Sequence, residues 1–111
     1  MAKAKKSIKG TKTEANLVKA YISESAAYTR YTYYAKQADK EEYYPIGQVF
    51  RETAENEIHH GKVFFKLLEG GKVNVTIDPD AGVIGNTAEN LATAAAEEEA
   101  EGIEQYIAAA K

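Results

Sequence analysis

Hydrophobic and small residues recur every three or four positions over three stretches of this chain. The stretches are residues 12–40, 45–69 and 87–111. This spacing is typical of a helix with one apolar face, because 3.6 residues make one helical turn. The pattern therefore predicts an all-α protein with three amphipathic helices.

Residues at the ends of these stretches carry helix-terminus signals. Thr13 is a candidate N-cap for the first helix, and Pro45 suits the first turn of the second. Gly70 and Gly71 follow the second helix, in the usual place for a C-terminal stop. We therefore expect the second helix to run from about Pro45 to Glu69.

The two connections differ in length, and this difference predicts the topology. The short link at residues 41–44 predicts an antiparallel hairpin of helices one and two. Residues 70–86 predict an extended crossover, broken by Asp78-Pro79-Asp80. A long crossover between hairpins is the topology of ferritin-like four-helix bundles. We therefore expect a single ferritin-like domain over residues 1–111, C-terminally incomplete, whose fourth helix comes from outside this chain.

Composition narrows the class of protein and of metal site. The chain has 111 residues, a net charge of −3 and no cysteine. The charge argues against nucleic acid as the main partner, and the lysines near the N-terminus predict a solvated tail. The lack of cysteine excludes disulfides, zinc–thiolate sites and Cys-ligated iron within these residues. Without a membrane-length apolar run or a signal-peptide pattern, we expect a soluble cytoplasmic protein with no membrane partner.

Glu24 is the first candidate for metal chemistry. It lies in the middle of the apolar stripe of the first helix, one turn from Ala20 and Ala27. An ionised carboxylate buried there needs a partner, whereas one at the edge of the stripe would reach solvent. An internal repeat places Glu24 on Glu98, so the third helix resembles a second copy of the first.

Further candidate ligands lie on the second and third helices. Glu57 and His60 are three residues apart, so both project from one helical face. Four-helix di-iron proteins combine such Glu-x-x-His pairs with single glutamates from other helices. Glu98 and Glu101 have the same spacing. The alternatives are a surface Glu–His pair and an exposed acidic face, and we expect His59 to be at the surface.

Several segments of the chain, in order, resemble the rubrerythrin family. They are Lys9–Thr13, Glu24–Tyr31, Tyr34–Ala38, Glu52–Glu57 with His60, and Ala81–Leu91. Rubrerythrins are di-iron peroxidases that reduce hydrogen peroxide to water. The resemblance therefore implies two bound iron ions, for which other divalent metals can substitute. The four-cysteine electron-donor domain of many members is absent from this sequence, so the electron donor is left unidentified.

The resemblance also implies roles for individual residues. Glu24, Glu57 and Glu98 match the carboxylate ligands of the family, and His60 matches its helix-two histidine. Glu101 matches an additional carboxylate that exchanges with this histidine on one iron when the metals are reduced. A hard carboxylate suits ferric iron, and an imidazole suits ferrous iron.

Tyr31 and Tyr106 match family tyrosines that hydrogen-bond to the metal ligands. The alternative for both is simple packing in the core with a satisfied hydroxyl. As catalytic candidates, they rest on the resemblance alone.

The last glutamate and histidine of the family come from its fourth helix, and three sources remain open for them. They are a continuation of the chain, a separate fragment after cleavage, and a second copy. We expect a homodimer with helix exchange as one solution, ranked below an additional fourth helix. Besides peroxide reduction, the sequence leaves open a ferroxidase or oxygen-reducing di-iron protein, an iron-storage protein and a metal-free helical module.

Overall fold

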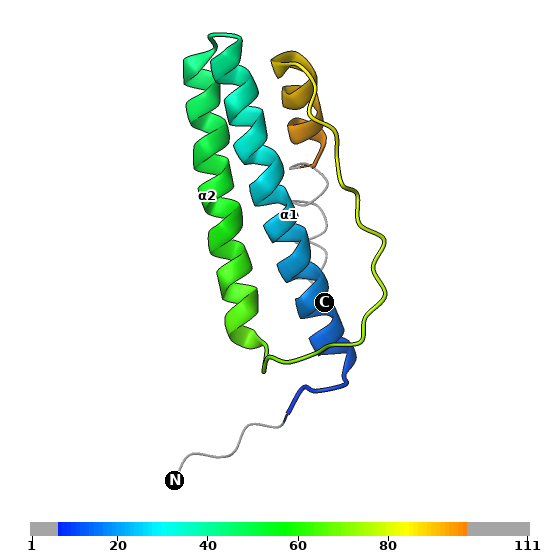
Figure 1. The fold of residues 1–111 in the computed structure, drawn as a ribbon. Coiled ribbons are helices and arrows are strands. Elements are labelled where there is room, and N and C mark those ends of the chain that lie inside the picture. Colours follow the sequence, from blue (N-terminus) through cyan, green and yellow to red (C-terminus); the bar gives the residue numbers. More distant parts are fainter. Residues whose placement is uncertain (1–6, 98–111) are drawn as a thin grey trace.

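The computed structural model describes residues 7–97 as a helical hairpin, a long connection and a third helical segment (Figure 1). Helix α1 spans Lys12–Lys40, and helix α2 spans Tyr44–Leu67. The third helical segment covers residues 87–97, and residues 7–97 contain no strand. The predicted all-α class and the bounds of the first helix are therefore confirmed.

The start of α1 differs in detail from the prediction. Thr11, rather than Thr13, is the N-cap, and its hydroxyl accepts a hydrogen bond from the backbone N–H of Glu14 at 3.2 Å. The Glu14 carboxylate in turn accepts one from the backbone N–H of Gly10 at 2.9 Å. Thr11 is therefore the N-cap, and the assignment of Thr13 was wrong; Glu14 reaches back to the N–H of Gly10, one residue before the N-cap residue that a capping box would use.

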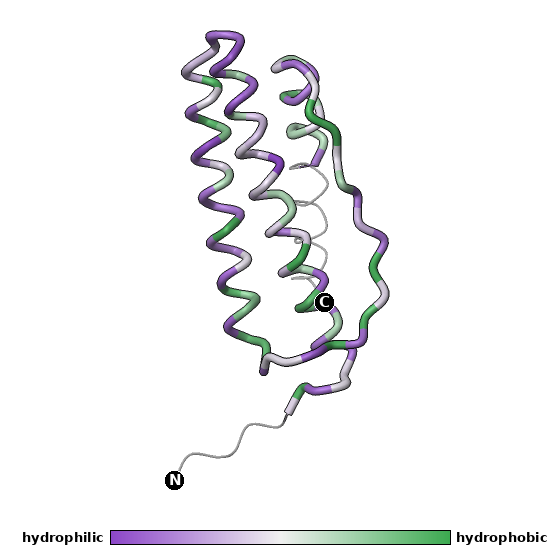
Figure 2. The backbone as a smooth tube through the Cα atoms, viewed as in Figure 1, coloured by the Kyte–Doolittle hydropathy of each residue, from purple (hydrophilic) through white to green (hydrophobic). Residues whose placement is uncertain are grey.

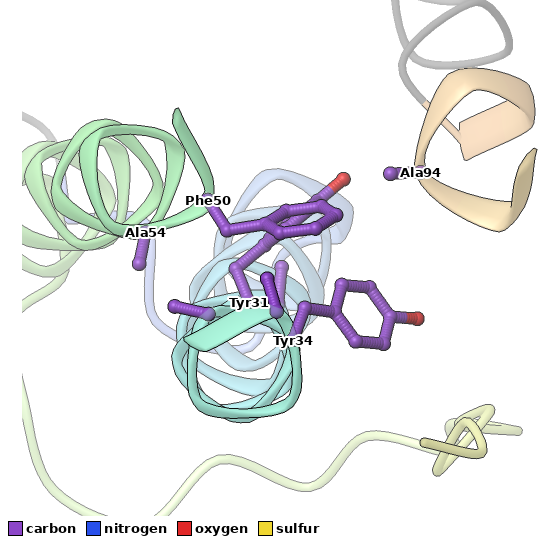
Figure 3. Close-up of a cluster of buried hydrophobic side chains, with 8 residues drawn as sticks. Tyr31, Tyr34, Phe50, Ala54 and Ala94 are labelled. Carbon is purple, nitrogen blue, oxygen red and sulfur yellow. The ribbon is translucent and has the colours of Figure 1, made fainter. Parts of the chain in front are cut away.

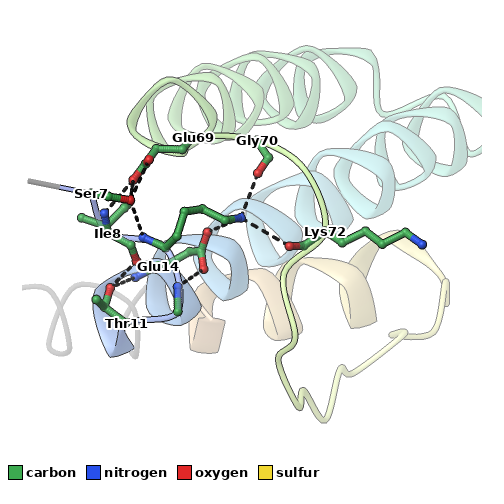
Figure 4. A network of polar contacts seen from close by, with 9 residues as sticks. Ser7, Ile8, Thr11, Glu14, Glu69, Gly70 and Lys72 are labelled. Atoms are coloured by element: carbon green, nitrogen blue, oxygen red, sulfur yellow. Dashed lines mark hydrogen bonds and ion pairs between the residues drawn. The ribbon is translucent and has the colours of Figure 1, made fainter.

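The segment before α1 is bound to the chain that follows α2 (Figure 4). The Lys9 ammonium lies 2.8 Å from the Glu14 carboxylate and donates to the Gly70 carbonyl at 3.0 Å. The Glu69 carboxylate accepts from the backbone N–H of Ile8 at 2.6 Å. These contacts close the open end of the hairpin. The hydrogen bonds from Lys9, and next from Gly10, hold the pKa of Glu14 below its usual value.

Helix α2 ends earlier than its glycines suggest. Pro45 lies in its first turn, as predicted, but the helix stops at Leu67, and Leu68 is already extended with ψ 152°. Gly70 and Gly71 adopt positive φ values of 83° and 76° within the connection. The predicted end at Glu69 is therefore about half a turn too late, because these glycines shape the connection and not the helix terminus.

Residues 68–86 have no regular secondary structure and return alongside α1 to the third helical segment (Figure 1). Asn86 caps that segment, since its side chain accepts from Glu89 N at 2.8 Å while Glu89 accepts from Asn86 N at 3.1 Å. The Glu41 carboxylate accepts from the N–H and hydroxyl of Thr87, at 2.8 and 2.5 Å. The α1–α2 turn therefore anchors the third segment. No helix in the described part of the chain is long and apolar enough to cross a membrane.

An aromatic cluster forms the core between the helices (Figure 3). The ring centroid of Tyr34 lies 5.5 Å from that of Tyr31 and 5.3 Å from that of Phe50, within the range that aromatic pairs favour. Ala54 of α2 and Ala94 of the third segment complete the cluster. The core therefore joins all three helical segments near the α1–α2 turn.

The apolar stripe predicted for α2 divides into a covered and an open face. Hydrophobic and hydrophilic positions alternate along the whole helix (Figure 2). Phe50 and Glu57 are buried, whereas Val49 is 56% exposed and Leu67 is also exposed. The described part of the chain thus leaves part of the predicted stripe exposed, and the site described next lies at the boundary between the covered and the open face.

Candidate metal centre

Glu24 enters the interior from the middle of α1. Its side chain lies on the buried face of the helix, which also carries Ala27 and Tyr31, and only 7% of the residue is exposed. Gly61 of α2 faces it, and a Cβ atom at Gly61 would lie 3.6 Å from Glu24 Cβ. A Cβ atom at this position would be in ordinary van der Waals contact with Glu24, so α2 lies close to α1 where Glu24 enters the core.

Glu57 and His60 approach Glu24 from α2. Glu57 is 3% exposed, whereas the His60 side chain, one turn further along, is 55% exposed. His60 Nδ1 lies 3.6 Å from Glu24 Oε2. Each of the three residues offers one ligand atom within 4.8 Å of the other two. The hairpin therefore brings together three of the five ligands suggested by the sequence.

This donor set suits a divalent metal ion. Glu24 and Glu57 are carboxylates buried close together, and two like charges in a low-dielectric setting repel each other. A cation between them offsets that repulsion. Two carboxylates and an imidazole are donors that ferrous and ferric iron both accept. The residues present therefore fit an iron site.

A groove leads from the open face of α2 to these ligands. It encloses about 390 Å³, and Glu57 and His60 form part of its wall. The remaining lining residues are Val49, Thr53, Asn56, Leu91, Ala94 and Ala95. The groove lies between α2 and the third helical segment, so the metal centre is enclosed by α1 on one side and open on the other.

The other predicted site residues fall into two groups. Tyr31 is buried in the aromatic cluster, and His59 is exposed, as predicted for the latter. Glu98, Glu101 and Tyr106 lie outside the described residues, so their predicted roles remain predictions.

Sequence reasoning missed an ion pair that holds the third helical segment to α1. Arg30 Nη2 lies 3.3 Å from Glu97 Oε2, and Glu97 directly precedes the predicted ligand Glu98. Gly82 of the connection packs against the Arg30 side chain so closely that a Cβ atom there would collide with Arg30 Cδ. The only indication of this ion pair in the sequence is the opposite charge of Arg30 and Glu97, and charge alone does not show which residues pair.

Comparison with known proteins identifies the family of this chain. The Rubrerythrin family model matches residues 15–111, nearly the whole chain. The chain belongs to the rubrerythrin family. A rubrerythrin from Porphyromonas gingivalis is 52% identical over 106 residues, which are 96% of this chain and 53% of that protein. A rubrerythrin from Nitratidesulfovibrio vulgaris is 43% identical over 101 residues, 91% of this chain and 53% of that protein.

Rubrerythrin-1 of Clostridium acetobutylicum is also similar, with 44% identity over 110 residues, 96% of this chain and 56% of that protein. The chain thus spans about half the length of the curated relatives it matches. Membership of the rubrerythrin family confirms the predicted ferritin-like fold and indicates iron binding. Glu24, Glu57 and His60 are the described residues that fit such a site.

Proposed function

We propose that this chain is the metal-binding part of a peroxidase that reduces hydrogen peroxide to water at a pair of iron ions. The observation that carries the proposal is the convergence of Glu24, Glu57 and His60, with two buried carboxylates beside an exposed imidazole. Glu98 and Glu101 are the further ligands expected from the resemblance.

Bound ferrous iron would supply the two electrons that, with two protons, convert one hydrogen peroxide into two waters. The residues of the chain hold and shield that chemistry. Glu24 and Glu57 offer hard, anionic donors from the buried side, where α1 and α2 exclude water. His60 lies on the groove side, and a groove of about 390 Å³ has ample room for hydrogen peroxide to approach.

We further propose that His60 and Glu101 alternate as ligands of one iron. The exposure of His60 on the groove side leaves its imidazole room to swing toward or away from a metal ion. Reduction favours the imidazole, and oxidation favours the carboxylate. Crystal structures of the oxidised and reduced protein test this exchange. Identical ligands in both states would contradict it.

We propose that a fourth helix from outside this chain covers the groove and supplies the remaining ligands. The apolar lining at Val49, Leu91 and Ala95 supports a helical occupant. Exchange of helices between two copies is the alternative, because two hairpins would together supply two sets of Glu24, Glu57 and His60. Sedimentation of the iron-loaded chain distinguishes the two, since helix exchange requires a dimer. A compact monomer with a full iron complement would contradict both.

Peroxide consumption under anaerobic conditions tests the proposed activity. The chain is loaded with ferrous iron, and oxidation of the metal is followed after addition of hydrogen peroxide or of oxygen. The proposal predicts faster oxidation by peroxide and a ratio of about two ferrous ions oxidised per peroxide. Faster reaction with oxygen would favour a ferroxidase, and uptake of many irons per chain would favour storage.

A further inference from the structure

One threonine lines the groove beside the metal centre, and its hydroxyl group has no role in the site described so far. Besides the candidate ligands Glu57 and His60, the polar side chains among the described lining residues are Thr53 and Asn56. The other lining residues are apolar, namely Val49, Leu91, Ala94 and Ala95. Asn56 is exposed, so water competes for its amide group, whereas Thr53 is half-buried. Thr53 is therefore the better shielded of the two polar groups.

The place of Thr53 in α2 brings it next to Glu57. The two residues are one turn apart, so they share a face of the helix with a rise of about 6 Å between them. Side chains on a helix lean toward its N-terminus, so the Glu57 side chain lies over the turn that carries Thr53. A small molecule that binds in the groove beside Glu57 therefore also meets Thr53.

The Thr53 hydroxyl has already given its proton to a hydrogen bond. It donates to the backbone carbonyl of Val49 at 2.9 Å. This bond uses the single proton of the hydroxyl group, while the oxygen keeps lone pairs that can accept hydrogen bonds. A valine would have nearly the same shape and would suit the apolar lining better, but it would lack this oxygen. Thr53 thus offers a hydrogen-bond acceptor in a mostly apolar groove.

We propose that Thr53 accepts a hydrogen bond from hydrogen peroxide in the groove and so favours peroxide over oxygen as the oxidant. Hydrogen peroxide carries two O–H donors, whereas molecular oxygen carries none. When the oxidant displaces water from Thr53, only peroxide replaces the hydrogen bond that the threonine loses. The inference rests on the proposed function, because it assigns a substrate contact within the same groove.

Binding of hydrogen peroxide to the zinc-loaded chain tests the contact without any turnover, because zinc is not a redox metal. The chain has no cysteine or tryptophan, and its single methionine is Met1, so millimolar peroxide leaves the groove chemically unchanged. Ala94 and Ala95 line the groove, and their ¹³C-labelled methyl groups report binding by NMR. The inference predicts methyl shifts that saturate with peroxide, and their absence in the parent chain would overturn it.

Matched variants separate the substrate contact from the bond within the helix. Thr53→Val should weaken peroxide binding about fivefold, as expected for the loss of one neutral hydrogen bond, and Thr53→Ser should restore it. Thr32 is the control, because it is also half-buried and its hydroxyl donates to the Tyr28 carbonyl at 2.9 Å, but it lines a different groove. Thr32→Val should bind peroxide like the parent. Equal affinities in all four proteins, or an equal loss in Thr32→Val, would overturn the inference.

The ferrous-loaded chain connects the contact to the choice of oxidant. In Thr53→Val the peroxide concentration that gives half the maximal oxidation rate should rise about fivefold, with little change in the maximal rate or in the rate with oxygen. Peroxide consumption with unchanged concentration dependence in Thr53→Val would overturn the inference and leave the proposed function intact. Failure of the parent chain to consume peroxide would contradict the proposed function, and the zinc experiment would still decide the role of Thr53.

Discussion

The covered and open faces of α2 carry similar residue types but have different surroundings. On the covered face, Phe50 is 3% exposed, and the small residues Ala54 and Gly61 are also buried. On the open face, Val49 and Leu67 are both more than half exposed, and Val49 lines the groove. Glu57 belongs to the first face, and His60 lies at the border with the second.

The difference indicates that the hairpin supplies only part of the metal centre. Packing between α1 and α2 fixes the carboxylates of Glu24 and Glu57 without a further helix. The open face leaves His60 accessible and exposes apolar side chains that stable soluble proteins usually cover. Substitutions on the covered face should therefore disturb folding or metal binding in the isolated chain, whereas those on the open face should act mainly through a partner helix.

The largest expected effect comes from removing the buried carboxylate of the covered face. Glu57→Ala should abolish most iron binding, because it removes one of the three clustered ligands. Iron content after gel filtration, with helicity from circular dichroism, provides the measurement. Glu55→Ala, an exposed position on the same helix, should keep its iron. Normal iron occupancy in Glu57→Ala would remove Glu57 from the site.

Neighbouring positions on the two faces should differ sharply in their effect on stability. Phe50→Ala should lower the free energy of unfolding by about 3 kcal/mol, because it opens a cavity in the aromatic cluster. Val49→Ala should change it by no more than about 0.5 kcal/mol in the isolated chain, since the side chain is already in solvent. Urea unfolding followed by circular dichroism measures both. Equal losses would show that the open face is covered in solution.

Two glycines of α2 should respond in opposite directions to alanine. At Gly47 a Cβ atom would collide with the Asp39 carboxylate, which Arg51 holds at 2.7 Å. Gly47→Ala should therefore cost about 1 kcal/mol, even after the gain in helix propensity.

At Gly61 the new Cβ atom would meet Glu24 Cβ at 3.6 Å, an ordinary contact. Gly61→Ala should therefore be neutral or stabilise the metal-free chain by up to about 1 kcal/mol. Thermal unfolding of both variants without metal is the measurement, and destabilisation by Gly61→Ala would show that the helices are closer than described.

The smallest effect concerns the carboxylate that anchors the third helical segment. The hydrogen bond from the Thr87 hydroxyl, and next that from Gln37, hold the pKa of Glu41 below the ordinary value of 4.5. A lowered folded-state pKa stabilises the protein above that value, and the contribution disappears as the pH falls through the folded pKa.

Glu41→Gln should therefore reduce stability at neutral pH, and its difference from the parent should shrink below pH 4.5. Urea unfolding across this pH range measures the difference, with exposed Glu42→Gln as the control. A constant difference at all pH values would contradict the role given to Glu41.

Local sequence signals predicted the helices, whereas contacts between residues far apart in the sequence could not be predicted. The bounds of α1 followed from periodicity, but its N-cap did not, because Thr11 and Thr13 are both suitable residue types and only Thr11 accepts the bond from the Glu14 N–H. The hydrogen bond from Thr87 to Glu41 joins residues that are 46 positions apart, and no local sequence pattern predicts it.

The candidate site shows the same division. Helical spacing placed Glu57 and His60 on adjacent turns, and their approach to Glu24 followed from the hairpin. The unequal burial of Glu57 and His60 could not be predicted from spacing, because it depends on which face of α2 is covered by other helices. The internal repeat that places Glu24 on Glu98, with an offset of 74 residues, also places Asn16 on Asn90. It was a poor guide to environment, since Asn16 is exposed whereas Asn90 is buried.

The central claim is that Glu24, Glu57 and His60 bind iron. Crystals of the iron-loaded chain, measured on both sides of the iron absorption edge, test it most directly. The account predicts an anomalous peak between these three side chains and its loss in Glu57→Ala crystals. Iron bound elsewhere, such as at Asp78 and Asp80 of the connection, with no peak between α1 and α2, would contradict it.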